Sequence, residues 1–272
     1  MLNMRVLTAA ILIMVIASGV LLLPSIWAAF VLAIPMFIGM IEWTKLAGLD
    51  KQQQFVVTAL SVAISIFTLW TLLNHILPIH WILNIAVLWW LINAWDINIS
   101  QKINVSTSPS ITTAMLGLFI LTTTWCSVIW LHTQPYGPWL LLFLLSLIWV
   151  ADSGAYFAGK RWGRTKLAPV LSPNKTMEGV YGAFISTLPL GIILATMFGT
   201  DIIQQIYLML MCLFTVGASI VGDLYESKLK RKRNLKDSGA LLPGHGGMLD
   251  RIDSLTAAAP VFVLGLIILG VI

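Results

Sequence analysis

Charged residues are scarce in this sequence, and so are cysteines. Only 10% of the 272 residues are Asp, Glu, Lys or Arg, against about 25% in soluble globular domains. This shortage of charge, together with a hydrophobic fraction of 58%, excludes a water-soluble domain. The apolar runs are continuous and do not alternate with polar residues, which argues against a β-barrel. Cys126 and Cys212 both lie in apolar runs, so no disulfide framework is expected.

Long apolar runs predict an all-α, polytopic integral membrane helical bundle with about nine transmembrane helices. A helix needs roughly 20 apolar residues to span a bilayer. The first run lacks a convincing signal-peptide cleavage site and is counted as a helix. The fourth is the shortest, and eight spans remain without it. The expected spans are 5–23, 25–48, 55–74, 78–95, 111–131, 138–158, 177–199, 202–222 and 255–272.

The positions of the positive charges predict the orientation of the bundle. With nine spans and a cytoplasmic N-terminus, all 16 Lys and Arg fall in or close to cytoplasmic segments. Lys and Arg are enriched in such loops, so the C-terminus is expected outside. We expect one membrane domain with N-terminal helices in 1–135. The catalytic half, 136–272, carries the cytoplasmic loops 159–176 and 223–254.

Three aspartates lie close to the ends of apolar runs, which indicates a metal site. Asp223 follows the eighth run, and Asp250 and Asp253 are three residues apart, so a helix would place these two on one face. Mg²⁺ commonly binds one or two carboxylates together with substrate phosphates. A hydrated charge cluster at the start of a helix is the simpler alternative, which the neighbouring glycines make less attractive.

Six of the nine residues at 228–236 are Lys or Arg. Such a run can bind a triphosphate and stabilise charge during its transfer. A lipid-headgroup anchor explains Lys232 and Arg233 better, because it needs no chemistry. Ser227 and Arg231 are better site candidates, since both would share a face with the preceding aspartate if the eighth helix continued.

Glycines follow the basic run, in Pro-Gly-His-Gly-Gly at 243–247. Glycine-rich turns let backbone N–H groups approach a phosphate, although an ordinary loop has the same composition. The run also resembles the His-Gly-Gly loop of lipases. However, the sequence has no Gly-x-Ser-x-Gly elbow, which argues against a serine hydrolase.

A second polar segment covers residues 152–178. Asp152 lies inside an apolar run, where a solvated surface charge is improbable. We expect Ser172 to begin a turn and Thr176 to cap the seventh helix. Lys175 would oppose the helix dipole unless an anion bound there. Glu178 has an equally good explanation as an acid that stabilises the first helical turn.

Two segments resemble the phosphatidate cytidylyltransferases, the CDP-diacylglycerol synthases. The likeness extends to the length and the multi-span layout, and the first 150 residues contribute only architecture to it. The weaker segment is Asp152-x-Gly154-Ala155-Tyr156 with Ser172-Pro173-x-Lys175-Thr176-x-Glu178-Gly179. The stronger segment is Ser227-x₂-Lys230-Arg231-x₄-Lys236-Asp237-x-Gly239-x₂-Leu242-Pro243-x-His245-Gly246-Gly247-x₂-Asp250-Arg251-x-Asp253.

The resemblance implies a bacterial inner-membrane enzyme that makes CDP-diacylglycerol and pyrophosphate from CTP and phosphatidate with Mg²⁺, and leaves room for a second cation. Its partners would be the two substrates and membrane lipid, without nucleic acid, and a homodimer stays open. Asp223 and Asp250 would hold the metal. Phosphate oxygens would be bound by Lys175, Lys230, Arg231 and Lys236. The remaining supporting or substrate-contacting residues would be Asp152, Ser172, Thr176, Glu178, Ser227, Asp237, His245, Gly246, Gly247, Arg251 and Asp253.

Other functions fit the sequence less well. A CTP-dependent lipid kinase would release CDP in place of pyrophosphate. A CDP-alcohol phosphotransferase would need an Asp-Gly-x₂-Ala-Arg pattern, which is missing. A transporter would spread its charges across the spans, whereas these gather on one face. A scaffold that binds anionic lipid would explain the bases but not the ordered acids.

Overall fold

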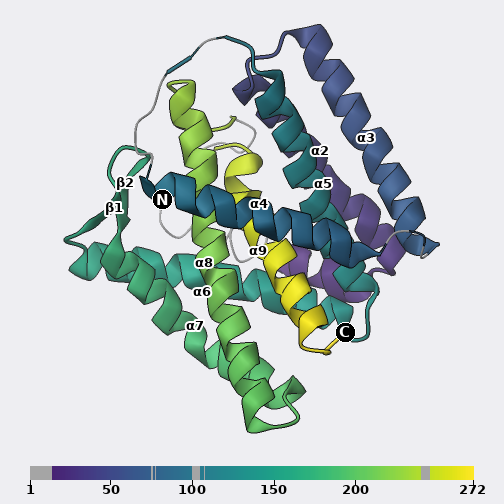
Figure 1. Cartoon of the computed structure of the whole chain (residues 1–272), viewed down its shortest axis with the longest axis vertical. Helices are drawn as coiled ribbons and strands as arrows, with labels where there is room; N and C mark the ends of the chain where they lie inside the picture. The colour runs from purple at the N-terminus through teal and green to yellow at the C-terminus, as the bar shows by residue number, and fades with distance from the viewer. Residues whose placement is uncertain (1–13, 75, 77, 100–104, 107, 240–245) are drawn as a thin grey trace.

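The helical bundle was examined in a computed structural model, which describes residues 14–74, 76, 78–99, 105–106, 108–239 and 246–272. Residues 14–22 are helical, and the predicted all-α class is confirmed except for one small β-hairpin (Figure 1). The elements that follow are α2 (Ser25–Leu46), α3 (Lys51–Leu73), α4 (Ile79–Ile99), α5 (Ile111–Thr133), α6 (Gly137–Trp162), β1 (Lys166–Ala168), β2 (Ser172–Thr176), α7 (Met177–Phe198), α8 (Ile202–Lys232) and α9 (Leu249–Ile268).

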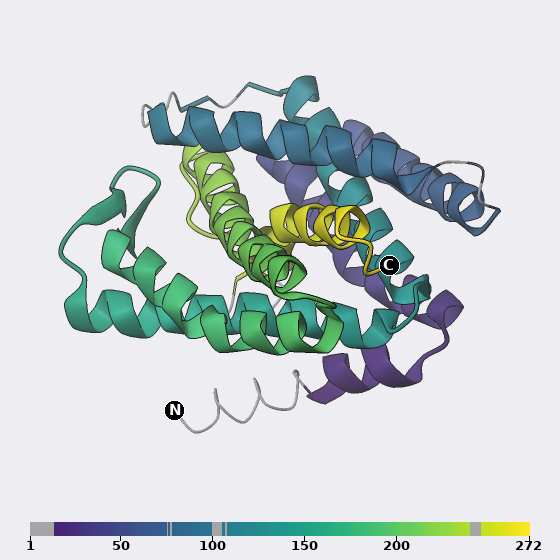
Figure 2. The ribbon, with the colours of Figure 1, turned by 60° about the horizontal axis from the view of Figure 1, so that its bottom comes forward.

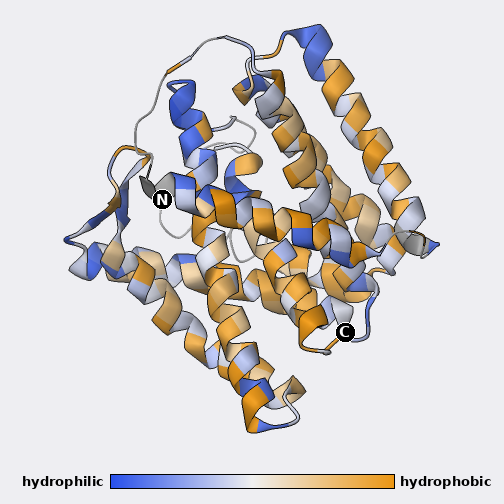
Figure 3. Ribbon diagram, viewed as in Figure 1, coloured by the Kyte–Doolittle hydropathy of each residue, from blue (hydrophilic) through white to orange (hydrophobic). Residues whose placement is uncertain are grey.

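Seven helices in the described part of the chain are long and apolar enough to cross a membrane. They are α2, α3, α5, α6, α7, α8 and α9. Helix α4 is not one of these seven candidate spans. It is a continuous helix, but Asn84, Asn93 and Asp96 lower the hydropathy of its otherwise apolar sequence. Figure 3 shows the long helices as mainly hydrophobic, with hydrophilic residues concentrated near helix ends and in the hairpin. The protein is therefore a polytopic membrane protein.

Large apolar side chains also cover the outside of the bundle. Trp95 of α4 is 72% exposed, Phe214 of α8 is 71% exposed and Ile268 of α9 is 72% exposed. Large apolar patches on a water-soluble protein mark binding surfaces or aggregation sites, but in a bilayer such side chains meet lipid tails. The outer surface thus agrees with the membrane assignment.

Helices α5 and α9 lie at the centre of the bundle, and α8 packs directly against α9 (Figures 1 and 2). Ile120 of α5 and Phe262 of α9 are both fully buried. The backbones of α8 and α9 approach closely at Gly222, where an added Cβ would lie 2.5 Å from the carbonyl oxygen of Asp253. A glycine at this position lets the polar ends of the two helices meet.

Small residues also bring α6 and α7 together. An added Cβ at Gly182 would contact the Cβ of Ala158 and lie 2.6 Å from the carbonyl oxygen of Gly154. Helices in membranes associate through such small residues, because these allow close van der Waals packing. This packing holds the hairpin, which connects α6 with α7, at one end of the bundle.

The connections between helices gather at two ends of the molecule. At the upper end of Figure 1, the Arg233 guanidinium donates hydrogen bonds to the carbonyl oxygens of Leu46 (2.7 Å) and Ser106 (2.8 Å). It joins the end of α8 to the end of α2 and to the segment before α5. At another end, Gln204 of α8 donates to the carbonyl oxygen of Leu269 (3.0 Å). The hydrogen bonds of Arg233 therefore bring together the ends of α2 and α8 and the segment before α5.

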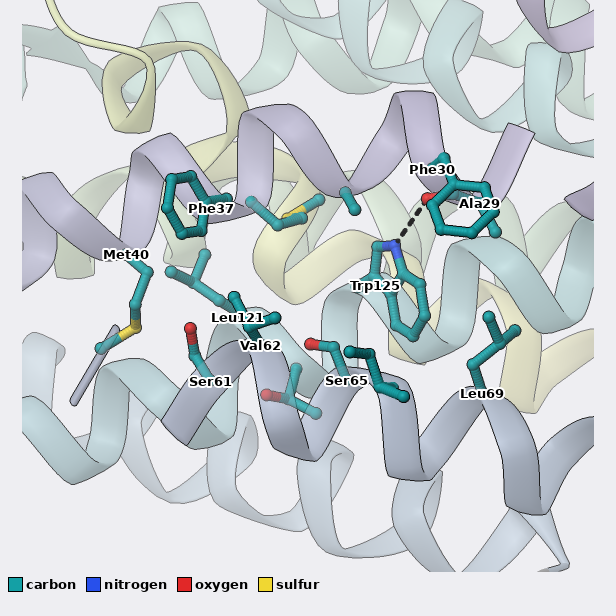
Figure 4. Close-up of a pocket in the computed structure, with 14 residues that line it drawn as sticks. Ala29, Phe30, Phe37, Met40, Ser61, Val62, Ser65, Leu69, Leu121 and Trp125 are labelled. Atoms are coloured by element: carbon teal, nitrogen blue, oxygen red, sulfur yellow. Dashed lines mark hydrogen bonds between the residues drawn. The ribbon is translucent and has the colours of Figure 1, made fainter. Parts of the chain in front are cut away.

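An apolar cavity lies among α2, α3 and α5 (Figure 4). Within it, Trp125 of α5 donates a hydrogen bond from its indole N–H to the carbonyl oxygen of Ala29 on α2 (3.2 Å). Ser61 and Ser65 of α3 contribute hydroxyl groups, and the lining carries no charged side chain. The charged residues that could take part in catalysis therefore lie outside this cavity.

Candidate active site between α8 and α9

Helix α8 continues beyond residue 222, where its apolar run ends, as far as Lys232. Asp223, Glu226, Ser227 and Lys230 follow one another at intervals of three, one and three residues, so they occupy one face of the helix. The hydroxyl of Ser227 lies 3.5 Å from Asp223 Oδ1. The helical continuation that made Ser227 a candidate is therefore confirmed.

Lys230 joins this face of α8 to α9. Its ammonium nitrogen lies 2.8 Å from Glu226 Oε2 and 2.5 Å from Asp250 Oδ1. The three side chains are nearly buried, with exposed fractions of 10%, 2% and 11%. Buried charges must be paired to be tolerated, and here one cation serves two acids on adjacent helices.

The carboxylate of Asp250 is held by the chain on its other side. Its Oδ2 accepts hydrogen bonds from the backbone N–H of Ser238 (3.0 Å) and of Gly247 (2.7 Å). Gly246 has a positive φ of 79°, and an added Cβ would lie 2.6 Å from the same oxygen. Only glycine suits this position. The Gly247 N–H, which we expected to face a phosphate, thus donates to Asp250 in this structure.

Asp223 forms a second ion pair, with Lys175 of β2. The Lys175 ammonium lies 2.5 Å from Asp223 Oδ2, and the side chains are 25% and 29% exposed. Asp152 of α6 lies within electrostatic range of both residues, and Asp253 of α9 does so as well. Four elements therefore bring charged groups to one place, which remains partly open to its surroundings.

Glu226 is the buried member of this acidic group, and Asp253 beside it is half-buried. Glu226 is 2% exposed and lies within electrostatic range of Asp253. Its Oε1 has no hydrogen-bond partner among the described residues. A buried oxygen without a donor is costly, so this position favours a cation or a donor supplied by a ligand.

The hairpin places Lys175 beside Asp223. Thr176 caps α7, as predicted, by accepting a hydrogen bond from the backbone N–H of Gly179 (3.1 Å). Glu178 accepts from the backbone N–H groups of Arg164 and Thr165, both at 3.1 Å. The predicted turn at Ser172 is wrong: the turn occupies 169–171, and Ser172 begins β2. Antiparallel pairing with β1 keeps residues 172–176 in an extended strand.

The other predicted site residues lie around this group. Arg231 donates hydrogen bonds to the carbonyl oxygens of Leu171 (3.2 Å) and Leu235 (2.8 Å), so it ties the hairpin to the end of α8. Arg251 lies within electrostatic range of Asp152. Lys236 and Asp237 are exposed. His245 lies outside the described residues.

The two aspartates proposed to hold a metal lie on α8 and α9, which pack against each other. Each one carries a lysine ammonium in this structure, Asp223 that of Lys175 and Asp250 that of Lys230. Among the described residues, no three His, Cys, Asp or Glu converge into a metal centre. Any metal here would therefore depend on oxygens from a substrate, a pattern that Mg²⁺ tolerates well.

Sequence reasoning missed two residues that contribute to the site. Glu226 could have been found from its spacing, three residues after Asp223 and four before Lys230, since both intervals join neighbours on a helix. Ser238 carried no comparable signal, because its two hydrogen bonds to Asp250 depend on how the loop after α8 folds back.

Known proteins are similar to this chain along nearly its whole length. The model of the cytidylyltransferase family matches residues 3–269. The chain belongs to this family. It is 37% identical over 271 residues to the phosphatidate cytidylyltransferase of Pseudomonas aeruginosa, with 96% of each chain covered. It is 35% identical over 281 residues to that of Haemophilus influenzae, with 96% and 97% covered. The one from Bacillus subtilis is 46% identical over 132 residues, 47% of this chain.

Proposed function

We propose that this membrane cytidylyltransferase transfers the cytidylyl group of CTP to phosphatidate, giving CDP-diacylglycerol and pyrophosphate. Relatives that match over nearly their full length carry the name phosphatidate cytidylyltransferase. The observation that carries the proposal is that the extension of α8 beyond residue 222 carries two acid–lysine ion pairs, Asp223 with Lys175 of the hairpin and Lys230 with Asp250 of α9. Such a site suits two polyanionic substrates.

The reaction needs little acid–base chemistry from the protein. A phosphate monoester has a second pKa of about 6, so phosphatidate is largely dianionic near neutral pH and is already a nucleophile. The protein must bring two anions together and stabilise charge on the leaving pyrophosphate. Lys175 and Lys230, which neutralise aspartates in this structure, are placed to bind phosphate oxygens when substrate enters, and Arg231, Arg251 and Lys236 lie nearby.

We further propose Asp223 and Asp250 as the metal-binding residues. A Mg²⁺ held there would supply positive charge that polarises the reacting phosphate groups. The fit rests on hard carboxylate oxygens from neighbouring helices and on Glu226 Oε1, which has no hydrogen-bond partner in the described part of the chain. Without substrate, Lys175 and Lys230 pair with these carboxylates and hold their orientation. Asp152 and Asp253 add negative charge that favours a second cation.

We place this site on the cytoplasmic side of the bacterial inner membrane, in a nine-span topology with the N-terminus inside and the C-terminus outside. Support comes from Arg233, which joins the ends of α2 and α8 and the segment before α5. Most Lys and Arg of the described chain lie near this end or in the hairpin. Positive residues favour the cytoplasmic side. CTP would enter from the cytoplasm and phosphatidate from the bilayer, in a monomer or a homodimer.

Product analysis separates cytidylyl transfer from the kinase alternative. Purified protein is incubated with phosphatidate and CTP labelled either at the α- or at the γ-phosphorus, with and without Mg²⁺. The proposal predicts that the α-label enters lipid and the γ-label leaves as pyrophosphate, only with the metal present. Transfer of the γ-label to lipid with release of CDP would establish a kinase in its place.

A further inference from the structure

Helix α2 carries a buried carboxylate from the N-terminal half of the chain to the start of α9. Glu42 is only 4% exposed. Its Oε1 accepts a hydrogen bond from the backbone N–H of Met248 (3.0 Å), and its Oε2 accepts from that of Leu249 (2.8 Å). Helix starts leave N–H groups without partners and favour negative charge. Glu42 thus caps a helix that lies more than 200 residues away in the chain.

The same carboxylate reaches Asp250 through a single residue. Glu42 Oε2 lies 2.9 Å from the hydroxyl of Ser238, and this hydroxyl lies 2.9 Å from Asp250 Oδ2. The hydroxyl has one proton for two carboxylates. Because Asp250 Oδ2 already accepts two backbone N–H groups, the Ser238 hydroxyl donates to Glu42 more effectively. Glu42 therefore fixes the position of Ser238, and the backbone N–H of Ser238 holds Asp250 in turn.

Two glycines leave room for this arrangement. An added Cβ at Gly239 would contact Glu42 Oε1, and one at Gly247 would lie 2.5 Å from Glu42 Oε2. These contacts would force the carboxylate away from the start of α9. Part of the glycine content of the segment after α8 is therefore explained by Glu42, independently of any phosphate.

We propose that Glu42 is a positioning residue that fixes Asp250 through Ser238 and the start of α9. The proposal rests on the role given to Asp250 in the proposed function. It assigns the N-terminal helices a part in catalysis beyond architecture, because α2 sets the position of a carboxylate in the catalytic half. A shift of about 1 Å in a catalytic group can cost about 100-fold in rate.

The Glu42→Gln variant tests the proposal with almost no change in volume. Among the described residues, the three groups that contact Glu42 are all donors, so the amide NH₂ must oppose one of them in either orientation. We expect kcat to fall by about 10- to 100-fold, with a raised Mg²⁺ requirement and little change in the KM for phosphatidate. Thr44→Val is the matched control, because Thr44 is fully buried on the same helix and bonds only to the carbonyl oxygen of Ile41.

Hydrogen exchange gives a readout that does not depend on turnover. In Glu42→Gln, the amides of Ser238, Met248 and Leu249 should exchange faster, because their hydrogen bonds open more often. Thr44→Val should leave these amides unchanged. Equal exchange in Glu42→Gln and the parent protein would overturn the proposal.

A double-mutant cycle with Ser238→Ala tests whether Glu42 acts on Asp250 through Ser238. If Glu42→Gln does not fold, the milder Ser238→Ala variant alone can be used to test this link. Ser238→Ala should itself lower kcat, and the double variant should lose no more activity than the more damaging of the two single variants, because both act on one contact network. Losses of kcat that multiply in the double variant would refute the positioning role of Glu42. Normal kcat in both single variants, once both are shown to be folded, would also refute it.

Asp250→Asn separates the two proposals: if this variant is active, the proposed role of Asp250 fails. If it is inactive while Glu42→Gln is normal, only the positioning link fails.

Discussion

Replacing Lys230 by Met removes the cation that two acids share. The Lys230 side chain is 10% exposed, and those of Glu226 and Asp250 are 2% and 11% exposed, so the substitution leaves two nearly buried carboxylates without their ammonium. Removing one partner of a buried ion pair costs about 3–5 kcal/mol. In a protein of this size, 1 kcal/mol shifts the Tm by roughly 2–4 °C. We therefore expect the Tm to fall by about 6–20 °C.

Lys228→Met is the matched control for this prediction. Lys228 lies on the same helix and forms an ion pair of 2.5 Å with Asp96, whose side chain is 51% exposed. Solvent can stabilise that carboxylate after the substitution, so the loss should be about 0–1 kcal/mol. Thermal unfolding of both variants in the same detergent measures the contrast. Equal Tm values for Lys230→Met and Lys228→Met would refute the reasoning that the shared cation stabilises the α8–α9 junction.

Three further substitutions have distinct expected results. Gly246→Ala should reduce kcat by about tenfold or more, because the φ of Gly246 is 79° and its new Cβ would lie only 2.6 Å from Asp250 Oδ2; unchanged steady-state rates would contradict this. Lys175→Ala should raise the KM for CTP by about tenfold, as expected for loss of a charged hydrogen bond, and an unaltered KM would count against a phosphate contact. Arg233→Ala should lower the unfolding free energy by about 2 kcal/mol, measured by denaturant titration, because its guanidinium bonds to Leu46 and Ser106 are lost; wild-type stability would show that this link is dispensable.

Much of the site was predictable because it depends on local spacing. Asp223, Ser227 and Lys230 fall on one face as soon as α8 continues past its apolar run. Thr176 caps α7 through a contact three residues away. Short-range rules of helix geometry cover both cases.

Contacts between distant segments were not predictable in this way. Arg233 looked like a lipid anchor, yet its guanidinium bonds to backbone carbonyls of two other segments. Glu42 is an isolated acid near the end of an apolar run, and its partners lie at 238 and 248–249. Such partners are set by how helices pack, and one sequence carries no record of that packing. The β-hairpin was missed because its strands are short and polar.

Turnover of Asp223→Ala and Asp250→Ala tests the central claim most directly. Each variant is purified, shown to be folded by thermal unfolding, and supplied with α-labelled CTP, phosphatidate and Mg²⁺. If these aspartates organise the reacting phosphates, labelled CDP-diacylglycerol will not form above background in either variant. Formation of the labelled lipid at the parent rate by either folded variant would contradict the account.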